Sequence, residues 1–298
     1  MITLSFLPAG IPRPTPACYQ IAGQTLVADG PLPELAAFAR PGPAAMPAVA
    51  PAGGIPAGAS PIFDQPAWVA GGERWVTCWA APAGYRLAVA GLGSWFVSQD
   101  GGQIGGQPPP EADAGLVRQV ALGPALILAL ALRGIYCLHA SAVQLPQGVV
   151  VFVGESGQGK STLAQYLAGQ GERRIADDLL PVVATPAGVL ARPYFPQLKF
   201  APQQQPAAGL AAELPVAAVV RLADDTAEIS LARLPAQQAI LTPVHHTAAA
   251  RLFAPPLLAR QLAFGRAVAG RVPVLRLDYP RRYEQLPAVW ERVKGVGG

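Results

Sequence analysis

The residues best suited to chemistry lie in one stretch, residues 154–162, which read GESGQGKST. This stretch matches G-x-x-x-x-G-K-[S/T], the pattern of a phosphate-binding loop. Glycines let successive backbone N–H groups turn inward around phosphate oxygens, and a following helix adds the positive end of its dipole. The predicted nucleotide-binding residues are Gly154, Glu155, Ser156, Gly157, Gln158, Gly159, Lys160, Ser161 and Thr162.

The last residues of this stretch predict the ligand in more detail. Lys160 would reach the β- and γ-phosphates of a nucleotide, and the Ser161 hydroxyl would bind Mg²⁺. We therefore predict ATP and Mg²⁺ as the cofactors.

Two adjacent carboxylates, Asp177 and Asp178, follow in the segment RRIADD. One carboxylate near the phosphates is enough to hold Mg²⁺. Adjacent side chains on a strand point in different directions, so the second carboxylate is available for another task. The residues alone leave open whether that task is catalytic or only the capping of a turn.

Histidine supplies the third candidate. His139 lies in an apolar, strand-like segment before the loop, where a lone histidine is either a satisfied core residue or a functional group. His245 and His246 lie in a segment flanked by Pro and Thr without a partner pattern, and we expect them on the surface without a role in the site.

The elements around the loop are expected to form an α/β unit. The run VVVFV before the loop is typical of a strand buried on both faces. A tight turn at residues 146–148 joins it to the strand that carries His139. After the loop, a helix is expected to end at Gly169, and RRIADDLLPVV should complete a right-handed βαβ unit. The two aspartates would then close that strand at the phosphate edge of the sheet.

Two domains are predicted. Residues 1–115 show short apolar alternations separated by Gly and Pro, such as WVTCWAA and YRLAVAG, which indicate a β-rich domain. A Pro/Ala/Gly-rich loop is expected at about residues 40–62. Residues 116–298 form the second domain, opened by an apolar helix at 116–133. Because its most apolar run, from residue 121, is too short to span a bilayer, we interpret it as a core helix.

Composition excludes several classes of protein. The 298 residues are 51% hydrophobic and 13% charged, which argues against disorder. The net charge of +4 comes from scattered arginines without a basic stripe, so no nucleic-acid partner is expected. Three cysteines without metal spacing and no signal peptide predict a reduced cytoplasmic protein without a membrane anchor.

The stretch LHASAVQLPQGVVVFVGESGQGKSTLA, followed by RRIADD, resembles the catalytic core of the HPr kinase/phosphorylases and related serine kinases. The segments GPLPELAAF, RPYFPQLKF and YPRRYEQLPAVW resemble the branch found beside peptide-modifying gene clusters, including lasso-peptide kinases. This likeness implies a P-loop kinase core of HPr-kinase type with a β-rich N-terminal domain. It also implies ATP-dependent phosphorylation of a serine hydroxyl, with Asp177 as general base, His139 close to it and Asp178 in the metal environment.

The same resemblance implies the partners: a peptide or protein substrate bearing Ser, with room for a separate leader-peptide-binding protein and for a homo-oligomer. No counterpart of the RGLGI-like signature of true HPr kinase/phosphorylases follows the core. HPr as substrate and phosphorolysis are therefore not carried over.

Other functions remain open at this stage. The acceptor could be another protein or a small hydroxyl metabolite. The chain could instead be an ATPase or a nucleotide-dependent switch, although it lacks the N-K-x-D motif that reads guanine. A scaffold that binds a nucleotide without transferring phosphate is the remaining alternative.

Overall fold

The computed structural model describes residues 1–6, 15–43, 45, 59–197 and 211–296. Its contacts divide the chain into two compact units. Unit 1 contains the described residues of 1–135 together with 249–258, and unit 2 contains those of 136–199, 206–248 and 259–298. Each unit has its own sheet, so the protein is mixed α/β with two sheets.

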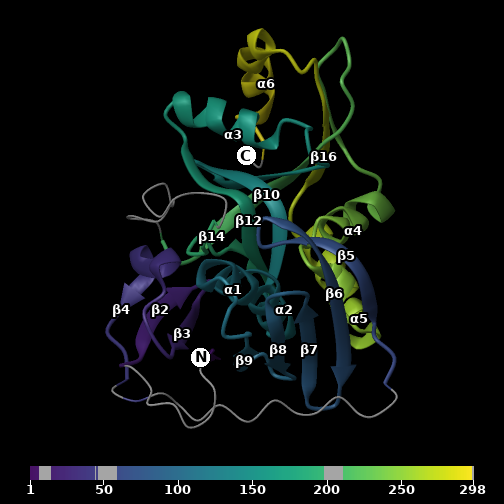
Figure 1. Ribbon diagram of the computed structural model, residues 1–298. Coiled ribbons are helices and arrows are strands. Elements are labelled where there is room, and N and C mark those ends of the chain that lie inside the picture. Colours follow the sequence, from purple (N-terminus) through teal and green to yellow (C-terminus); the bar gives the residue numbers. More distant parts are fainter. Residues whose placement is uncertain (7–14, 44, 46–58, 198–210, 297–298) are drawn as a thin grey trace. The chain divides into compact units, whose positions relative to one another are not determined.

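Unit 1 is built on a nine-stranded sheet in the order β4-β2-β3-β1-β9-β8-β7-β6-β5 (Figure 1). The interior strand β1 pairs in parallel with β3 and β9, and β5 to β9 form a meander of antiparallel neighbours. Its strands are β1 Ile2–Ser5, β2 Ala17–Ile21, β3 Gln24–Ala28, β4 Ala39–Arg40, β5 Phe63–Val69, β6 Gly72–Ala81, β7 Gly84–Val89, β8 Gly93–Ser98 and β9 Gln103–Gln107. The described part of the segment expected to be β-rich is therefore β-rich. Most of the predicted loop at 40–62 lies outside the described residues.

One long helical segment packs against β8 and β9 of unit 1. It comprises α1 Ala114–Val120, a π-turn at Ala121–Ala125 and α2 Leu126–Leu132. Pro124 lies inside the π-turn, where its missing N–H interrupts the regular helix. The contacts thus divide the chain after Ile135, whereas the sequence predicted the division at residue 115. The physical reason is that the apolar face of this helix is buried on the unit 1 sheet.

The observed segment nearly coincides with the helix expected at residues 116–133. Ala114–Leu132 is 19 residues long with a mean hydropathy of 1.8, so by length and composition alone it could cross a membrane. The sequence interpretation considered only the apolar run from residue 121, whereas the helical segment begins at Ala114. In the structure, 72% of its most apolar 18-residue window is buried.

Unit 2 contains a seven-stranded sheet in the order β11-β10-β12-β13-β14-β16-β15, and β11 also pairs with β14. Five strands, β10 to β14, therefore form a closed ring of pairings. The strands are β10 Tyr136–Leu145, β11 Gly148–Val153, β12 Arg173–Thr185, β13 Gly188–Ala191, β14 Leu214–Leu222, β15 Ser230–Arg233 and β16 Val274–Asp278. The helices are α3 Lys160–Gly169, α4 Ala236–His245, α5 Pro255–Ala269, which begins within unit 1, and α6 Leu286–Val293.

The predicted βαβ unit needs correction. After α3 the chain enters β12, but β12 pairs antiparallel with β10 and not with β11. The parallel neighbour of β11 is β14. β10 occupies one edge of β11 and β14 occupies the other, so β12 joins the far edge of β10.

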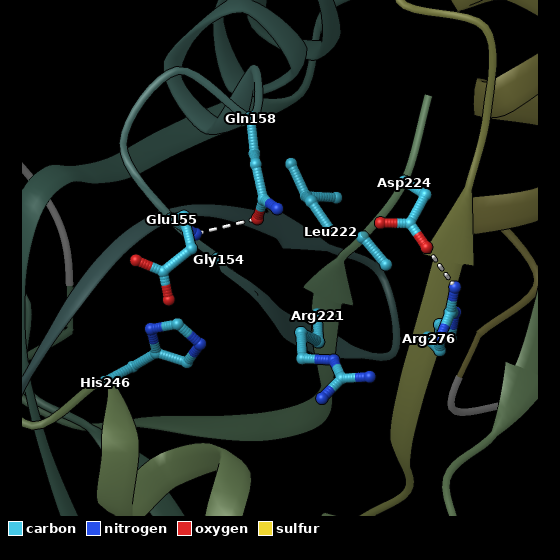
Figure 2. Close-up of a pocket in the computed structure, with 9 residues that line it drawn as sticks. Gly154, Glu155, Gln158, Arg221, Leu222, Asp224, His246 and Arg276 are labelled. Atoms are coloured by element: carbon cyan, nitrogen blue, oxygen red, sulfur yellow. Dashed lines mark hydrogen bonds and ion pairs between the residues drawn. The ribbon is translucent and has the colours of Figure 1, made fainter. Parts of the chain in front are cut away.

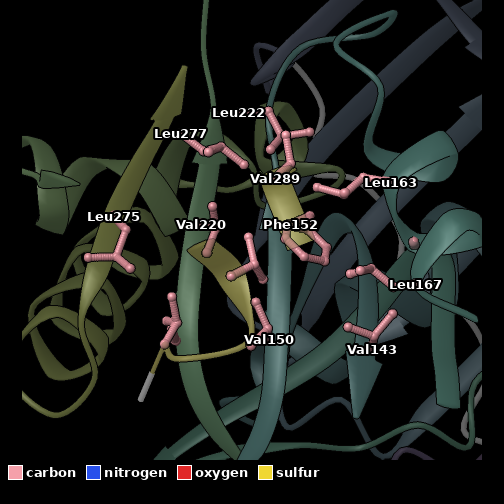
Figure 3. Close-up of a cluster of buried hydrophobic side chains, with 14 of the residues drawn as sticks. Val143, Val150, Phe152, Leu163, Leu167, Val220, Leu222, Leu275, Leu277 and Val289 are labelled. Atoms are coloured by element: carbon pink, nitrogen blue, oxygen red, sulfur yellow. The ribbon is translucent and has the colours of Figure 1, made fainter. Parts of the chain in front are cut away.

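The core of unit 2 lies under α3 and α6, which pack against each other (Figure 1). Phe152 of β11 and Val220 of β14 meet Leu163 and Leu167 of α3 and Val289 of α6 (Figure 3). All six residues of β11 are buried, as the continuous apolar run predicted. This core fixes the end of β11, and with it the start of the loop at residue 154.

Candidate functional site

The glycine-rich loop, residues 154–159, joins the carboxyl end of β11 to α3. Gly154, Gly157 and Gly159 have φ of 152°, 83° and 86°. A Cβ atom at Gly154 would collide with Gln158 Oε1, and one at Gly159 would lie 2.7 Å from Tyr279 Oη. Glycine is needed at these two positions because both the backbone conformation and the space exclude a side chain.

Polar groups of the loop are arranged to receive an oxyanion. Gln158 Oε1 accepts the Glu155 N–H at 2.7 Å and holds the loop in shape. Among the described residues, the backbone N–H groups of Ser156, Gly157 and Gly159 meet no hydrogen-bond acceptor. Free N–H groups at the start of a helix bind phosphate well.

Lys160 lies inside the same loop and is only 8% exposed. Its Nζ donates to the carbonyl oxygens of Gly154 at 2.8 Å and of Glu155 at 2.9 Å. A buried ammonium group beside free N–H donors favours a negatively charged ligand. These residues therefore fit the triphosphate that the sequence predicted.

The two aspartates occupy the middle of β12, not its end as the sequence predicted. Asp177 of β12 lies opposite Ser141 of β10, and Ser141 lies opposite Phe152 of β11. In the same way, Asp178 lies opposite Ala140, and Ala140 lies opposite Val153. Both carboxylates are thus two strands away from the end of β11, roughly 10 Å for two strand spacings. β12 continues past them because it goes on to pair with β10 and β13.

Asp177 is a buried and tightly held carboxylate, 8% exposed. Its Oδ1 accepts the Ser141 hydroxyl at 2.6 Å, and its Oδ2 accepts Arg174 Nη1 at 3.1 Å. The Gln197 side chain accepts the N–H groups of Asp177 and Leu179, so the strand here is fixed as well. Asp177 therefore has a single defined orientation.

Asp178 has a different partner. His139 Nδ1 lies 3.4 Å from Asp178 Oδ1, and the His139 side chain is 42% exposed. The resemblance placed His139 close to Asp177, whereas the contact observed here is with Asp178. The two carboxylates do have separate environments, as expected for neighbours on a strand.

His246 is the residue that the sequence interpretation missed. Beyond the end of β11, residues 246–248 pair with the same edge of β10. The His139 N–H donates to the His246 carbonyl at 2.7 Å, and the Ala248 N–H donates to the Cys137 carbonyl at 2.8 Å. These bonds hold His246 beside the glycine-rich loop, where it is half-buried and lines a pocket, whereas the sequence predicted a surface residue.

A pocket of about 190 Å³ opens beside the loop (Figure 2). Its lining residues are Gly154, Glu155, Gln158, Arg221, Leu222, Ala223, Asp224, His246 and Arg276. Burial, helped by the positive charge of Lys160, lowers the pKa of His246 to about 4, although Glu155 acts in the opposite direction. The imidazole is therefore neutral at physiological pH and can both donate and accept a hydrogen bond.

Two arginines complete the pocket. Arg221 lies opposite both Val153 on β11 and Arg276 on β16, so all three share one row of the sheet. Only one signal in the sequence pointed to Arg221, a charged residue near the end of the apolar strand VAAVVRL. Its place next to β11 depends on a pairing between distant segments, which no local pattern reveals.

The described residues contain no group of three or more His, Cys, Asp or Glu side chains that could hold a metal ion by themselves. Magnesium bound to a nucleotide does not require one, because phosphate oxygens and water supply most of its ligands. Ser161 is exposed on the first turn of α3. Its hydroxyl as a ligand of Mg²⁺ stays a prediction from the sequence.

Comparisons with known proteins give a distant structural likeness. The chain is similar to the Hpr(Ser) kinase/phosphatase from Coxiella burnetii, with a TM-score of 0.32 and 12% identity, over 53% of this chain and 93% of that one. No protein-family model matches the sequence, and the search of curated proteins gave no match. A likeness of this extent carries no argument about activity, so the function is argued below from the residues.

Proposed function

We propose that this protein is an ATP-dependent kinase that transfers a phosphoryl group to a serine hydroxyl. One observation carries the proposal: a phosphate-binding motif in a fitting conformation shares its sheet with a buried carboxylate that metal binding does not require. The loop and Lys160 account for nucleotide binding. Asp177 and Asp178 together supply one carboxylate more than Mg²⁺ needs.

Each residue then has a defined task. The N–H groups of the loop and Lys160 would bind the phosphates. Ser161 and Asp178 would hold Mg²⁺, which would neutralise phosphate charge. Asp177 takes the proton of the acceptor hydroxyl. The acceptor oxygen bonds to phosphorus while the bond from phosphorus to the leaving oxygen of ADP breaks. His139 orients the Asp178 carboxylate through the contact at 3.4 Å.

For the acceptor, we propose a ribosomally made precursor peptide of the lasso type, presented with or without a separate leader-binding protein. This choice rests on the sequence resemblance alone. Another protein or a small hydroxyl metabolite would use the same phosphoryl-transfer chemistry, so the assay must include these acceptors.

The decisive experiment incubates the protein with MgATP and candidate acceptors and follows phosphate by mass spectrometry. We expect a product heavier by one phosphate group on a serine of the acceptor. Lys160→Ala should abolish it. ATP hydrolysis that is independent of every acceptor would instead favour an ATPase, and ATP binding without turnover would favour a scaffold.

The base assignment has its own test. Asp177→Asn should lower kcat by about 10²–10⁴-fold, the usual contribution of a general base. Ser141→Ala keeps the carboxylate but removes its hydrogen bond, so it is the matched control for positioning and should have a smaller effect. Transfer at a near wild-type rate by Asp177→Asn would remove Asp177 from this role, and a loss in Asp178→Asn alone would assign the base to Asp178.

A further inference from the structure

The pocket beside the glycine-rich loop contains an arginine that the proposed mechanism has not yet used. Arg221 lies on β14 directly opposite Val153, the last residue of β11 before the loop. Its guanidinium lies between the His246 ring and Arg276 in the pocket (Figure 2). Its charged group is therefore next to the place where phosphates would bind.

The neighbouring arginine is already engaged by carboxylates. Arg276 Nε lies 2.8 Å from Asp278 Oδ2, and its Nη2 lies 2.7 Å from Asp224 Oδ2. Arg221, in contrast, makes no hydrogen bond or ion pair with any residue that the structure describes. It acts on Asp278 only at longer range, as one of the positive charges that lower the pKa of that carboxyl group. Arg221 thus retains all its donors for a ligand.

His246 adds a second ligand group to the same pocket. Its backbone carbonyl accepts a hydrogen bond from the His139 N–H. This bond holds the residue near the loop. Because the ring is neutral, it can donate one hydrogen bond without adding a second charge. A guanidinium together with a neutral imidazole N–H is suited to a tetrahedral oxyanion, which accepts several hydrogen bonds at once.

We infer that Arg221 and His246 form a subsite for the phosphoryl group in transfer, the γ-phosphate of ATP, next to the glycine-rich loop. This inference rests on the proposed function, which it deepens. Arg221 would stabilise the charge on the phosphoryl oxygens in the transition state, in addition to Lys160, which reaches both the β- and the γ-phosphate.

Calorimetry and kinetics test the subsite separately. Wild type and Arg221→Gln are titrated with MgATP, with MgADP and with inorganic tripolyphosphate as a probe that lacks the base and sugar. We expect Arg221→Gln to bind MgATP and tripolyphosphate about 10-fold more weakly and MgADP within twofold of wild type. Its kcat should fall about 10²–10³-fold, the usual effect of removing one donor to a transition-state oxyanion.

The matched control is Arg266→Gln, which removes the same charge from an exposed position on α5 outside the pocket. It should leave all three affinities and kcat unchanged. Arg221→Lys restores the charge without the planar fork of donors and should recover only part of kcat. His246→Gln, which keeps a donor, should retain more activity than His246→Ala.

The possible results separate this inference from the proposed kinase activity. If no acceptor is phosphorylated but MgATP binding still falls selectively in Arg221→Gln, the kinase proposal fails and the subsite stands. If MgATP and MgADP weaken equally, Arg221 contacts phosphates common to both, and the assignment to the γ-phosphate is overturned. Unchanged binding and kcat, or a wild type that binds none of the three probes, would also overturn it.

Discussion

Replacing Gly159 and Gly157 by alanine tests the conformation of the glycine-rich loop directly. Both residues have a left-handed backbone, with φ of 86° and 83°. Any L-residue placed there costs about 1–2 kcal/mol. The two sites differ in space: nothing lies within 4 Å of a Cβ at Gly157, whereas a Cβ at Gly159 would lie 2.7 Å from Tyr279 Oη.

Tyr279 cannot move away at little cost, because it is 3% exposed and belongs to the unit 2 core. Overpacking of this kind costs about 1–3 kcal/mol. We therefore expect Gly157→Ala to lower the free energy of unfolding by about 1–2 kcal/mol. Gly159→Ala should lower it by at least about 1 kcal/mol more than Gly157→Ala does.

Tyr279→Phe should rescue the second variant. Without the hydroxyl, the next ring atom, Cζ, lies 4.0 Å from the added Cβ, an ordinary contact. The hydroxyl makes only a long contact with the Gln158 carbonyl, at 3.5 Å, so its loss alone should cost little. The double variant Gly159→Ala/Tyr279→Phe should therefore match Gly157→Ala in stability.

Urea unfolding followed by far-UV circular dichroism measures these differences as shifts of the midpoint at a common slope. Wild type, Gly159→Ala, Tyr279→Phe and the double variant form a double-mutant cycle, in which an interaction energy of about 1 kcal/mol is expected between positions 159 and 279. Equal stabilities of the two alanine variants, or an interaction energy near zero, would refute the loop geometry.

Three further predictions concern unit 2 and the buried thiols. Burial raises the pKa of Cys78 to about 12 and also raises the pKa of Cys137. Iodoacetamide at pH 8 should therefore leave both thiols unmodified until urea unfolds the chain. Mass spectrometry measures the modification. Phe152→Ala should cost about 3–5 kcal/mol of stability in urea, whereas Trp68→Ala, at a site 77% exposed, should change it by no more than about 0.5 kcal/mol. Since the pKa of His246 is lowered from 6.5 to about 4, the unfolded chain binds its proton first. Wild type should therefore lose stability as the pH falls from 6.5 towards 4, more steeply than His246→Asn in parallel thermal melts.

The sequence by itself determined the parts of the site that are local in the chain. A continuous apolar run predicted β11, the glycines and Lys160 predicted the loop, and the apolar spacing with Gly169 predicted the extent of α3. Each of these signals depends on backbone conformation or burial over fewer than about a dozen residues, where patterns are reliable. The tight turn between β10 and β11 was predicted for the same reason.

Only the tertiary structure decided which distant segments meet at the loop. The sequence placed Asp177 and Asp178 at a strand end, but β12 pairs along β10 and leaves them in its middle. Arg221 reaches the loop because β14 pairs in parallel with β11, and His246 reaches it because residues 246–248 occupy the edge of β10 that β11 leaves open. Strand pairing joins backbone groups whose hydrogen bonds are the same for every sequence, so the partner is chosen by the packing of the whole core and not by any local motif.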